Sequence, residues 1–363
     1  MPILTMLAQR HAVPLTSAMR KLSLTILLAL ALAGCSTQTP HSALRTPQSS
    51  SPPPAPTTRI ARPDTNTVQL QIVLRKFLPP HHRGPAIWLA GTMHVGEPQY
   101  YREVQKFLDA QTVVLFEGVN ADSHPRHVSG PRRIAVRPAP RETGTNAGYS
   151  MQSSLAESLG LVFQLDAINY DRPNFLNSDL SVLQIQRLMA GEPKAAPAVP
   201  GQPSRSNASF DALLQIMDGS SFLGSLVKMG MQFIGSNPKL QAMTKLTLIE
   251  AIGRLQGDFT TLRNMPPDLK QLLQVLIEAR NQQVISDLKT ELKIIPRSGS
   301  IAVFYGTGHM EDMEKRLTSE LHYRPADEIW LTSFSVDLKK AGITPGEAEI
   351  MRNLVKWEMD QMQ

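Results

Sequence analysis

The chain of 363 residues contains a single cysteine, Cys35. One cysteine cannot form an intramolecular disulfide bond, and it excludes zinc modules and iron–sulfur clusters that need several cysteine ligands. Aromatic residues are also few, at 6%, but hydrophobic residues make up 42% of the chain and are numerous enough to fill a core. We therefore expect one large or two modest folded domains that packing alone stabilises.

Three common catalytic signatures are missing from the sequence. It contains no His-Glu-x-x-His, no Gly-x-Ser-x-Gly and no Gly-x-x-x-x-Gly-Lys. The local motifs of zincin proteases, of hydrolases with a nucleophile elbow and of P-loop nucleotidases are thus absent.

The formal net charge of +6 first suggests a nucleic-acid partner. Residues 1–34 contribute +3 of it, and residues 120–149 contribute another +3 through five arginines opposed by Asp122 and Glu142. The rest of the chain sums to zero. Because the basic excess belongs to two local segments, we expect no nucleic-acid partner.

Residues 1–34 have the pattern of a secretory signal peptide. Arg20 and Lys21 precede about 11 mostly apolar residues, too few for a bilayer that needs about 20 helical residues. The following Leu-Ala-Gly-Cys resembles the lipobox of bacterial lipoproteins, which implies a lipidated Cys35 and an anchor in the cell envelope. In lipoproteins a serine after the cysteine, here Ser36, implies the outer membrane. The alternative is that Cys35 is a buried free thiol. Residues 35–66, rich in proline, serine and threonine, predict a tether.

The hydrophobic pattern of residues 67–340 predicts one mixed α/β domain. Two proline-rich stretches, 120–149 and 191–207, predict flexible insertions, and 208–295 predicts a helical cap. The pattern predicts strands at 67–78, 86–91, 112–116, 301–305 and 328–334, an extended segment at 162–168, and helices at 97–110, 155–159 and 310–321. Residues 341–363 predict an amphipathic helix or tail.

A strand, Gly-x-x-His, helix and strand succession occurs near each end of this domain. The strands at 86–91 and 112–116 predict a βαβ unit with a parallel pair, and the unit beginning at 301–305 repeats the pattern. The architecture we expect is therefore two β-(GxxH)-α-β halves that share one mixed sheet, with the helical segment between them.

His94 and His309 close the two Gly-x-x-His motifs, and Glu117 ends the strand that follows the first. In open α/β sheets, ligands bind beyond the carboxyl ends of the strands, so these side chains converge if their strands are neighbours. Two imidazoles and a carboxylate bind a divalent transition metal, or a histidine held by a carboxylate acts as a general base without metal. A lone histidine at a strand end is more often a hydrogen-bonded structural residue.

The paired Gly-Thr-x-His motifs, the Val-Val-Leu-Phe strand before Glu117 and the helical Ala279-Arg280-Asn281 resemble the TraB/PrgY/GumN family, which includes the TIKI metalloproteases. The similarity covers roughly residues 68 to 335 without the two proline-rich insertions. Other residues stand where the middle motif of that family is expected: Asp166, Tyr170, Asn174, Phe175, Ser178, Asp179 and Leu180.

The resemblance to the TIKI branch implies a metal-dependent peptidase with His94, Glu117 and His309 as ligands of manganese, cobalt or zinc. Other relatives in that family resemble erythromycin-esterase-type folds, which implies instead a hydrolase that uses the same residues without metal. PrgY and TraB limit pheromone signalling, which implies a third alternative, a non-catalytic surface protein that sequesters a peptide.

Arg280 is the remaining candidate. It lies in a stretch whose apolar residues recur at helical spacing, and it either holds a carboxylate or oxyanion in the sheet crevice or faces solvent. The family resemblance favours a functional role, with Asn281 as a weaker partner. We therefore expect a lipid-anchored hydrolase in which Arg280 positions a peptide or small-molecule substrate.

Overall fold

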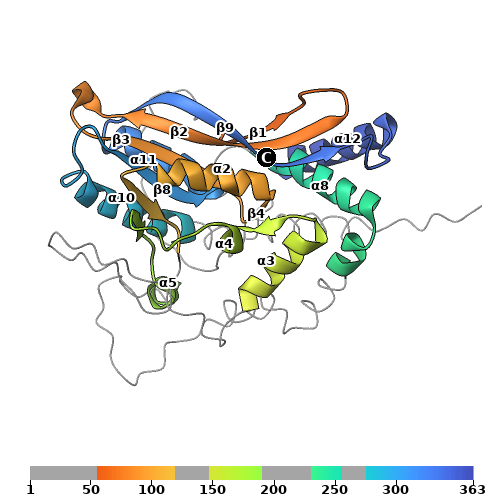
Figure 1. Cartoon of the computed structure of the whole chain (residues 1–363), viewed down its shortest axis with the longest axis horizontal. Helices are drawn as coiled ribbons and strands as arrows, with labels where there is room; N and C mark the ends of the chain where they lie inside the picture. Colours follow the sequence, from red (N-terminus) through yellow and green to blue (C-terminus); the bar gives the residue numbers. More distant parts are fainter. Residues whose placement is uncertain (1–54, 119–146, 190–229, 256–274, 363) are drawn as a thin grey trace, which may run out of the picture.

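The computed structural model describes residues 55–118, 147–189, 230–255 and 275–362 (Figure 1). The predicted signal peptide, Cys35, most of the tether and nearly all of the two proline-rich insertions lie outside these residues.

The predicted mixed α/β fold class is confirmed. In the described part of the chain, seven strands form one mixed sheet in the order β1-β2-β3-β8-β5-β7, and β9 pairs with β2 on the side away from β3. The strands are β1 (Thr58–Ala61), β2 (Thr67–Leu78), β3 (Ala86–Thr92), β5 (Val113–Phe116), β7 (Phe175–Asn177), β8 (Ser300–Gly306) and β9 (Arg324–Asp337).

The two motif-bearing strands are neighbours at the centre of the sheet. β8 pairs in parallel with β3 on one side and with β5 on the other. The predicted parallel pair of β3 and β5 is therefore wrong as an adjacent pair, because β8 inserts between them from about 190 residues later in the chain. This insertion brings the carboxyl ends of all three strands to one edge.

Helices cover both faces of the sheet, and side chains of β8 alternate between them. Ala302 and Phe304 join one core, whereas Ile301, Val303 and Tyr305 join the other. The first core includes residues of α2 (Pro98–Asp109), α3 (Ala147–Ser158), α8 (Pro238–Ile252) and α12 (Pro345–Met362). The second includes residues of α10 (Arg280–Glu291) and α11 (Met310–Ser319).

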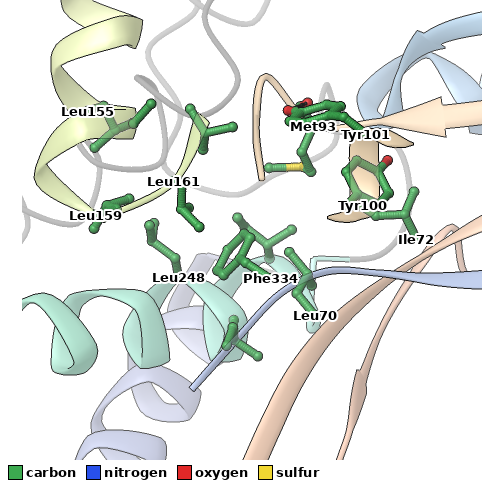
Figure 2. Close-up of a cluster of buried hydrophobic side chains, with 14 of the residues drawn as sticks. Leu70, Ile72, Met93, Tyr100, Tyr101, Leu155, Leu159, Leu161, Leu248 and Phe334 are labelled. Carbon is green, nitrogen blue, oxygen red and sulfur yellow. Dashed lines mark hydrogen bonds between the residues drawn. The ribbon is translucent and has the colours of Figure 1, made fainter. Parts of the chain in front are cut away.

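Figure 2 shows how the first core joins distant segments. Phe334 of β9 and Leu70 of β2 lie close to Leu248 of α8, with Leu155 of α3 on one side and Tyr101 of α2 on the other. Both α8 and α10 come from the stretch predicted as a helical cap. They pack on opposite faces of the sheet, because each presents apolar residues to a different core.

Shorter elements connect this framework. They are the two-stranded sheet of β4 (Val95–Gly96) and β6 (Val162–Phe163), the helices α4 (Gln164–Ala167) and α5 (Val182–Met189), the 3₁₀ turns Pro80–His82 and Thr307–His309, and the π-helical turn Val275–Ala279.

The prediction that residues 162–168 are extended is correct only for β6. Its partner β4 is two residues long, so strand pairing stops after Phe163. The backbone N–H of Ile168 then donates to the carbonyl oxygen of Gln164 at 2.9 Å and closes the helical turn α4.

The folded domain begins earlier than the predicted end of the tether at residue 66. Thr58–Ala61 forms β1 against β2, and Thr58 Oγ1 donates to the carbonyl oxygen of Ile252 at 3.0 Å. Arg75 donates to the carbonyl oxygens of Ala55 and Pro56. Backbone pairing and these polar contacts hold a segment whose composition is typical of a linker.

The C-terminal helix α12 is part of the domain. Val355 and Met359 are buried in the first core, while Ile350, Leu354 and Trp357 on the opposite side are exposed. Among the described residues, no helix combines the length and the apolar character that crossing a bilayer requires.

We expect Glu250→Gln to lower the free energy of unfolding by about 2–3 kcal/mol. Glu250 is fully buried on α8 and pairs with Arg62, Arg254 and Arg352. Breaking a buried pair costs about 3–5 kcal/mol, and the three arginines recover part of that loss because each reaches solvent.

Urea unfolding measures this effect, with Glu320→Gln as the control because Glu320 pairs with Lys289 at the surface. Equal losses in the two variants would contradict the structural role of Glu250.

Candidate active site

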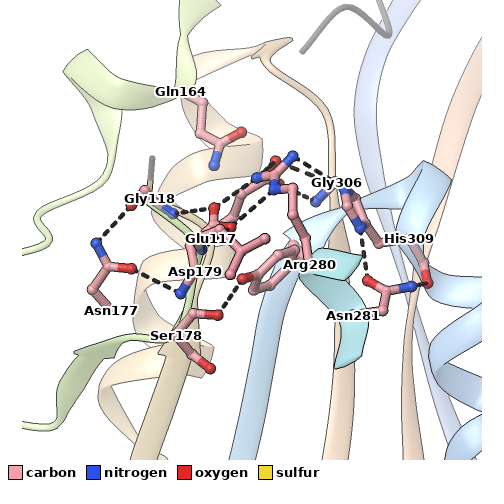
Figure 3. Close-up of polar contacts among 12 residues, drawn as sticks. Glu117, Gly118, Gln164, Asn177, Ser178, Asp179, Arg280, Asn281, Gly306 and His309 are labelled. Carbon is pink, nitrogen blue, oxygen red and sulfur yellow. Dashed lines mark hydrogen bonds and ion pairs between the residues drawn. The ribbon is translucent and has the colours of Figure 1, made fainter. Parts of the chain in front are cut away.

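The carboxyl ends of β3, β8 and β5 bring the predicted residues to one edge of the sheet. His94 follows β3 by two residues, His309 ends the 3₁₀ turn after β8, and Glu117 directly follows β5. Figure 3 shows Glu117, Arg280 and His309 side by side, reached from β5, α10 and the turn after β8.

Glu117 links the end of its own strand to the end of β8. Its Oε1 accepts a hydrogen bond from Arg280 Nη2 at 2.6 Å, and its Oε2 accepts one from the backbone N–H of Gly306 at 2.8 Å. Both carboxylate oxygens therefore already have strong donors.

Arg280 is buried, so the solvent-facing alternative is wrong. Its Nε and Nη2 donate to the two carboxylate oxygens of Asp179 at 2.9 and 2.6 Å, which is the bidentate arrangement typical of strong arginine–carboxylate pairs. Asp179 also accepts from the backbone N–H groups of Gly118 and Leu180. In the sequence, Asp179 stands where the middle motif of the TraB/PrgY/GumN family is expected, but the pattern predicted no role for it in the site.

His309 lies within reach of both charged partners. Its Nε2 is 3.5 Å from Arg280 Nη1 and 3.8 Å from Glu117 Oε1, and its Nδ1 is 2.7 Å from Asn281 Oδ1. The ring of Tyr305 lies against the imidazole, edge to face, with 5.2 Å between centroids. His309 is thus held on three sides.

His94 is half-buried beside this group. Among the described residues, no ion pair joins it to Glu117 or His309, although both Glu117 and Arg280 act on it electrostatically. Its carbonyl oxygen accepts the backbone N–H of Gln164 at 2.8 Å. The structure therefore brings His94 near the group without a direct contact to Glu117.

Gln164 is a site residue that the sequence analysis missed, since it falls in a segment predicted as extended. Its side chain is buried and extends toward the site (Figure 3). Its Nε2 donates to Tyr170 Oη at 2.8 Å, and its side chain also interacts with the imidazole of His94, while no donor among the described residues reaches its Oε1 with hydrogen-bond geometry. A buried acceptor of this kind suits an N–H or O–H donor from a ligand.

The charges of the site follow from burial and proximity. Burial by itself raises the pKa of Glu117. Arg280, the two motif histidines and the Gly306 N–H lower this pKa by more than burial raises it, so the net pKa lies well below its usual range. Burial together with Arg280 outweighs Glu117 and lowers the pKa of His309 to about 4. Burial also lowers the pKa of His94.

These shifts leave both imidazoles neutral at pH 7. Arg280 stays charged, because Asp179 and Glu117 raise its pKa well above the ordinary value although burial opposes them. One guanidinium therefore lies between two carboxylates, beside two neutral bases.

This arrangement does not fit the predicted metal centre. Arg280 donates to Glu117 Oε1 and lies 3.5 Å from His309 Nε2, so a cationic side chain already lies against two of the three predicted ligands. In the part of the chain that the structure describes, no three His, Cys, Asp or Glu side chains are grouped so as to hold a metal ion. A metal ligated by Glu117 and His309 requires Arg280 to move away from Glu117.

Comparisons of the chain with protein-family models, with curated proteins and with solved structures found no match. The family resemblance therefore rests on the motifs alone.

The lowered pKa of His309 predicts a loss of stability in acid. Between pH 6.5, where an unfolded histidine titrates, and about pH 4, the unfolded chain binds a proton that folded His309 does not. The free energy of unfolding then falls by about 1.4 kcal/mol per pH unit, or about 3 kcal/mol over this interval.

Urea unfolding of the wild type and of His309→Gln at pH 7 and pH 4 measures this contribution. We expect the stability difference between the two proteins to change by about 3 kcal/mol, with the wild type losing more in acid. Parallel pH dependences would contradict a buried, neutral His309.

Proposed function

We propose that the chain is a hydrolase in which His309 takes a proton from the attacking water. The observation that carries the proposal is the position of His309 Nε2, which lies 3.8 Å from Glu117 Oε1 and 3.5 Å from Arg280 Nη1. A neutral imidazole at that position can accept a proton at pH 7, and its lowered pKa makes it a weaker base than a free imidazole.

Glu117 supports the base after the proton has moved. Once Nε2 is protonated, the imidazolium faces the carboxylate at 3.8 Å, and the opposite charges attract in a site of low solvent exposure. Burial and Arg280 oppose this protonation, so His309 is neutral before the reaction begins.

Arg280 supplies a donor for the oxygen on which negative charge develops. Nε and Nη2 hold Asp179 and Glu117, and Nη1 is the guanidinium nitrogen that meets no carboxylate in the described part of the chain. A donor fixed in advance stabilises a transition-state oxyanion without reorganising. His94 lies at the same edge, where it contacts the substrate or leaving group.

Two sequence features support a peptide as the substrate and the cell envelope as the location. The motifs resemble the TraB/PrgY/GumN family, whose TIKI branch consists of peptidases, and Leu-Ala-Gly-Cys resembles a lipobox that anchors the chain through Cys35. A lipid-anchored hydrolase of the outer membrane accounts for both.

A peptide-binding protein without catalysis is the second candidate. The buried Oε1 of Gln164 favours it, because no donor among the described residues reaches this oxygen with hydrogen-bond geometry and a peptide N–H is a suitable donor beside His94.

Hydrolysis of a mixed pool of peptides by protein purified without a histidine tag tests the proposal. We expect His309→Gln to lower kcat by about 10²–10⁴-fold, the usual contribution of a general base. His322→Asn is the matched control, because His322 is exposed and has a left-handed backbone that asparagine also adopts.

Chelation separates the alternatives. Activity that survives exhaustive chelation supports His309 as the base, whereas activity lost on chelation and restored by manganese, cobalt or zinc would return the site to metal chemistry. Tight capture of a peptide that is recovered intact would support the binding protein and contradict the hydrolase.

A further inference from the structure

Asn281 lies directly behind the proposed base. It is fully buried near the start of α10, and its Oδ1 is 2.7 Å from Nδ1 of His309, on the side of the ring away from Glu117 (Figure 3). The two residues are 28 positions apart in the sequence.

The orientation of the Asn281 amide is determined by two other contacts. Its Nδ2 donates to the carbonyl oxygen of His309 at 3.2 Å and to Asp312 Oδ2 at 2.8 Å. Both partners only accept hydrogen bonds, so the reversed amide would bring its oxygen against two acceptors. The amide oxygen must therefore be the atom that faces His309.

An amide oxygen only accepts, so Nδ1 of His309 must carry the proton. In the neutral ring, Nε2 is then unprotonated and directs its lone pair toward Arg280 Nη1 and the space beside Glu117. The other tautomer would leave two acceptors facing each other at Nδ1 and two donors facing each other at Nε2.

We propose that Asn281, held by Asp312, fixes His309 in the Nδ1–H tautomer and is a positioning residue for the base. Asp312 is itself held by Arg316, whose Nε donates to Asp312 Oδ2 at 2.7 Å one helical turn away. The chain of contacts thus runs from the surface of α11 to the imidazole. The catalytic part of this inference rests on the proposed function, but the tautomer does not.

Nitrogen-15 NMR of histidine-labelled full-length protein at pH 7 tests the tautomer directly, with the signals of His309 identified by their loss in His309→Gln. We expect wild-type His309 to be a single Nδ1–H tautomer. A wild-type ring protonated at Nε2 would overturn the inference, whatever the behaviour of any variant.

Two variants test whether Asn281 is the cause. Asn281→Leu should produce the Nε2–H tautomer or a mixture and lower kcat by about 10–100-fold with little change in KM. The double variant N281D/D312N exchanges the amide and the carboxylate. A carboxylate oxygen at position 281 then accepts from Nδ1 of His309, and an amide at position 312 donates to that carboxylate. It should restore the Nδ1–H tautomer.

Asn353→Leu makes the same substitution at an exposed position of α12 and should change neither readout. An unchanged tautomer in Asn281→Leu would overturn the inference. If the tautomers are as predicted but the wild type hydrolyses no peptide, the inference about Asn281 stands and the result counts against the proposed function instead.

Discussion

The guanidinium of Arg280 between Glu117 and Asp179 is the interaction on which the site depends. It joins α10 to the end of β5 and to the turn after β7, three segments that are far apart in the sequence. A buried carboxylate without a partner costs several kcal/mol, and here one cation serves two of them. The position of α10 on its face of the sheet and the geometry at the strand ends are therefore coupled.

The order of the strands explains why the catalytic candidates gather at one edge. With β8 between β3 and β5, the turn that carries His309 lies next to the residue that follows β5, and the backbone N–H of Gly306 donates to Glu117. The contacts that stabilise this edge also orient Arg280 Nη1 and His309 Nε2. Preorganisation of this kind is the main source of electrostatic catalysis in enzymes.

Much of the framework could be predicted from the sequence, because local patterns determine it. The alternation and apolar runs of β2, β3 and β8 indicate strands with nearly the bounds that the structure has, and a charged residue that ends an apolar strand placed Glu117 at the sheet edge. The strand β1 escaped prediction because it is only four residues long, lies in a segment of linker-like composition and depends on pairing with β2 for its stability.

The partners inside the site could not be predicted in the same way. Asp179 lies 101 residues from Arg280, and Asn281 lies 28 residues from His309, so their contacts exist only once β8 has inserted and α10 has packed. The metal centre was expected from the residue types, from their positions at the strand ends and from the family resemblance. None of these features reveals that Arg280 donates to Glu117, one of the predicted ligands.

The stability effect of Glu117→Gln in two backgrounds tests the central role of Arg280 most directly. In the wild type the substitution removes a partner of the guanidinium and should lower the free energy of unfolding. In Arg280→Met it removes a buried charge that has lost its partner and should raise that free energy. A reversal of sign in urea unfolding at pH 7 is the result we predict, and a loss of stability in both backgrounds would contradict it.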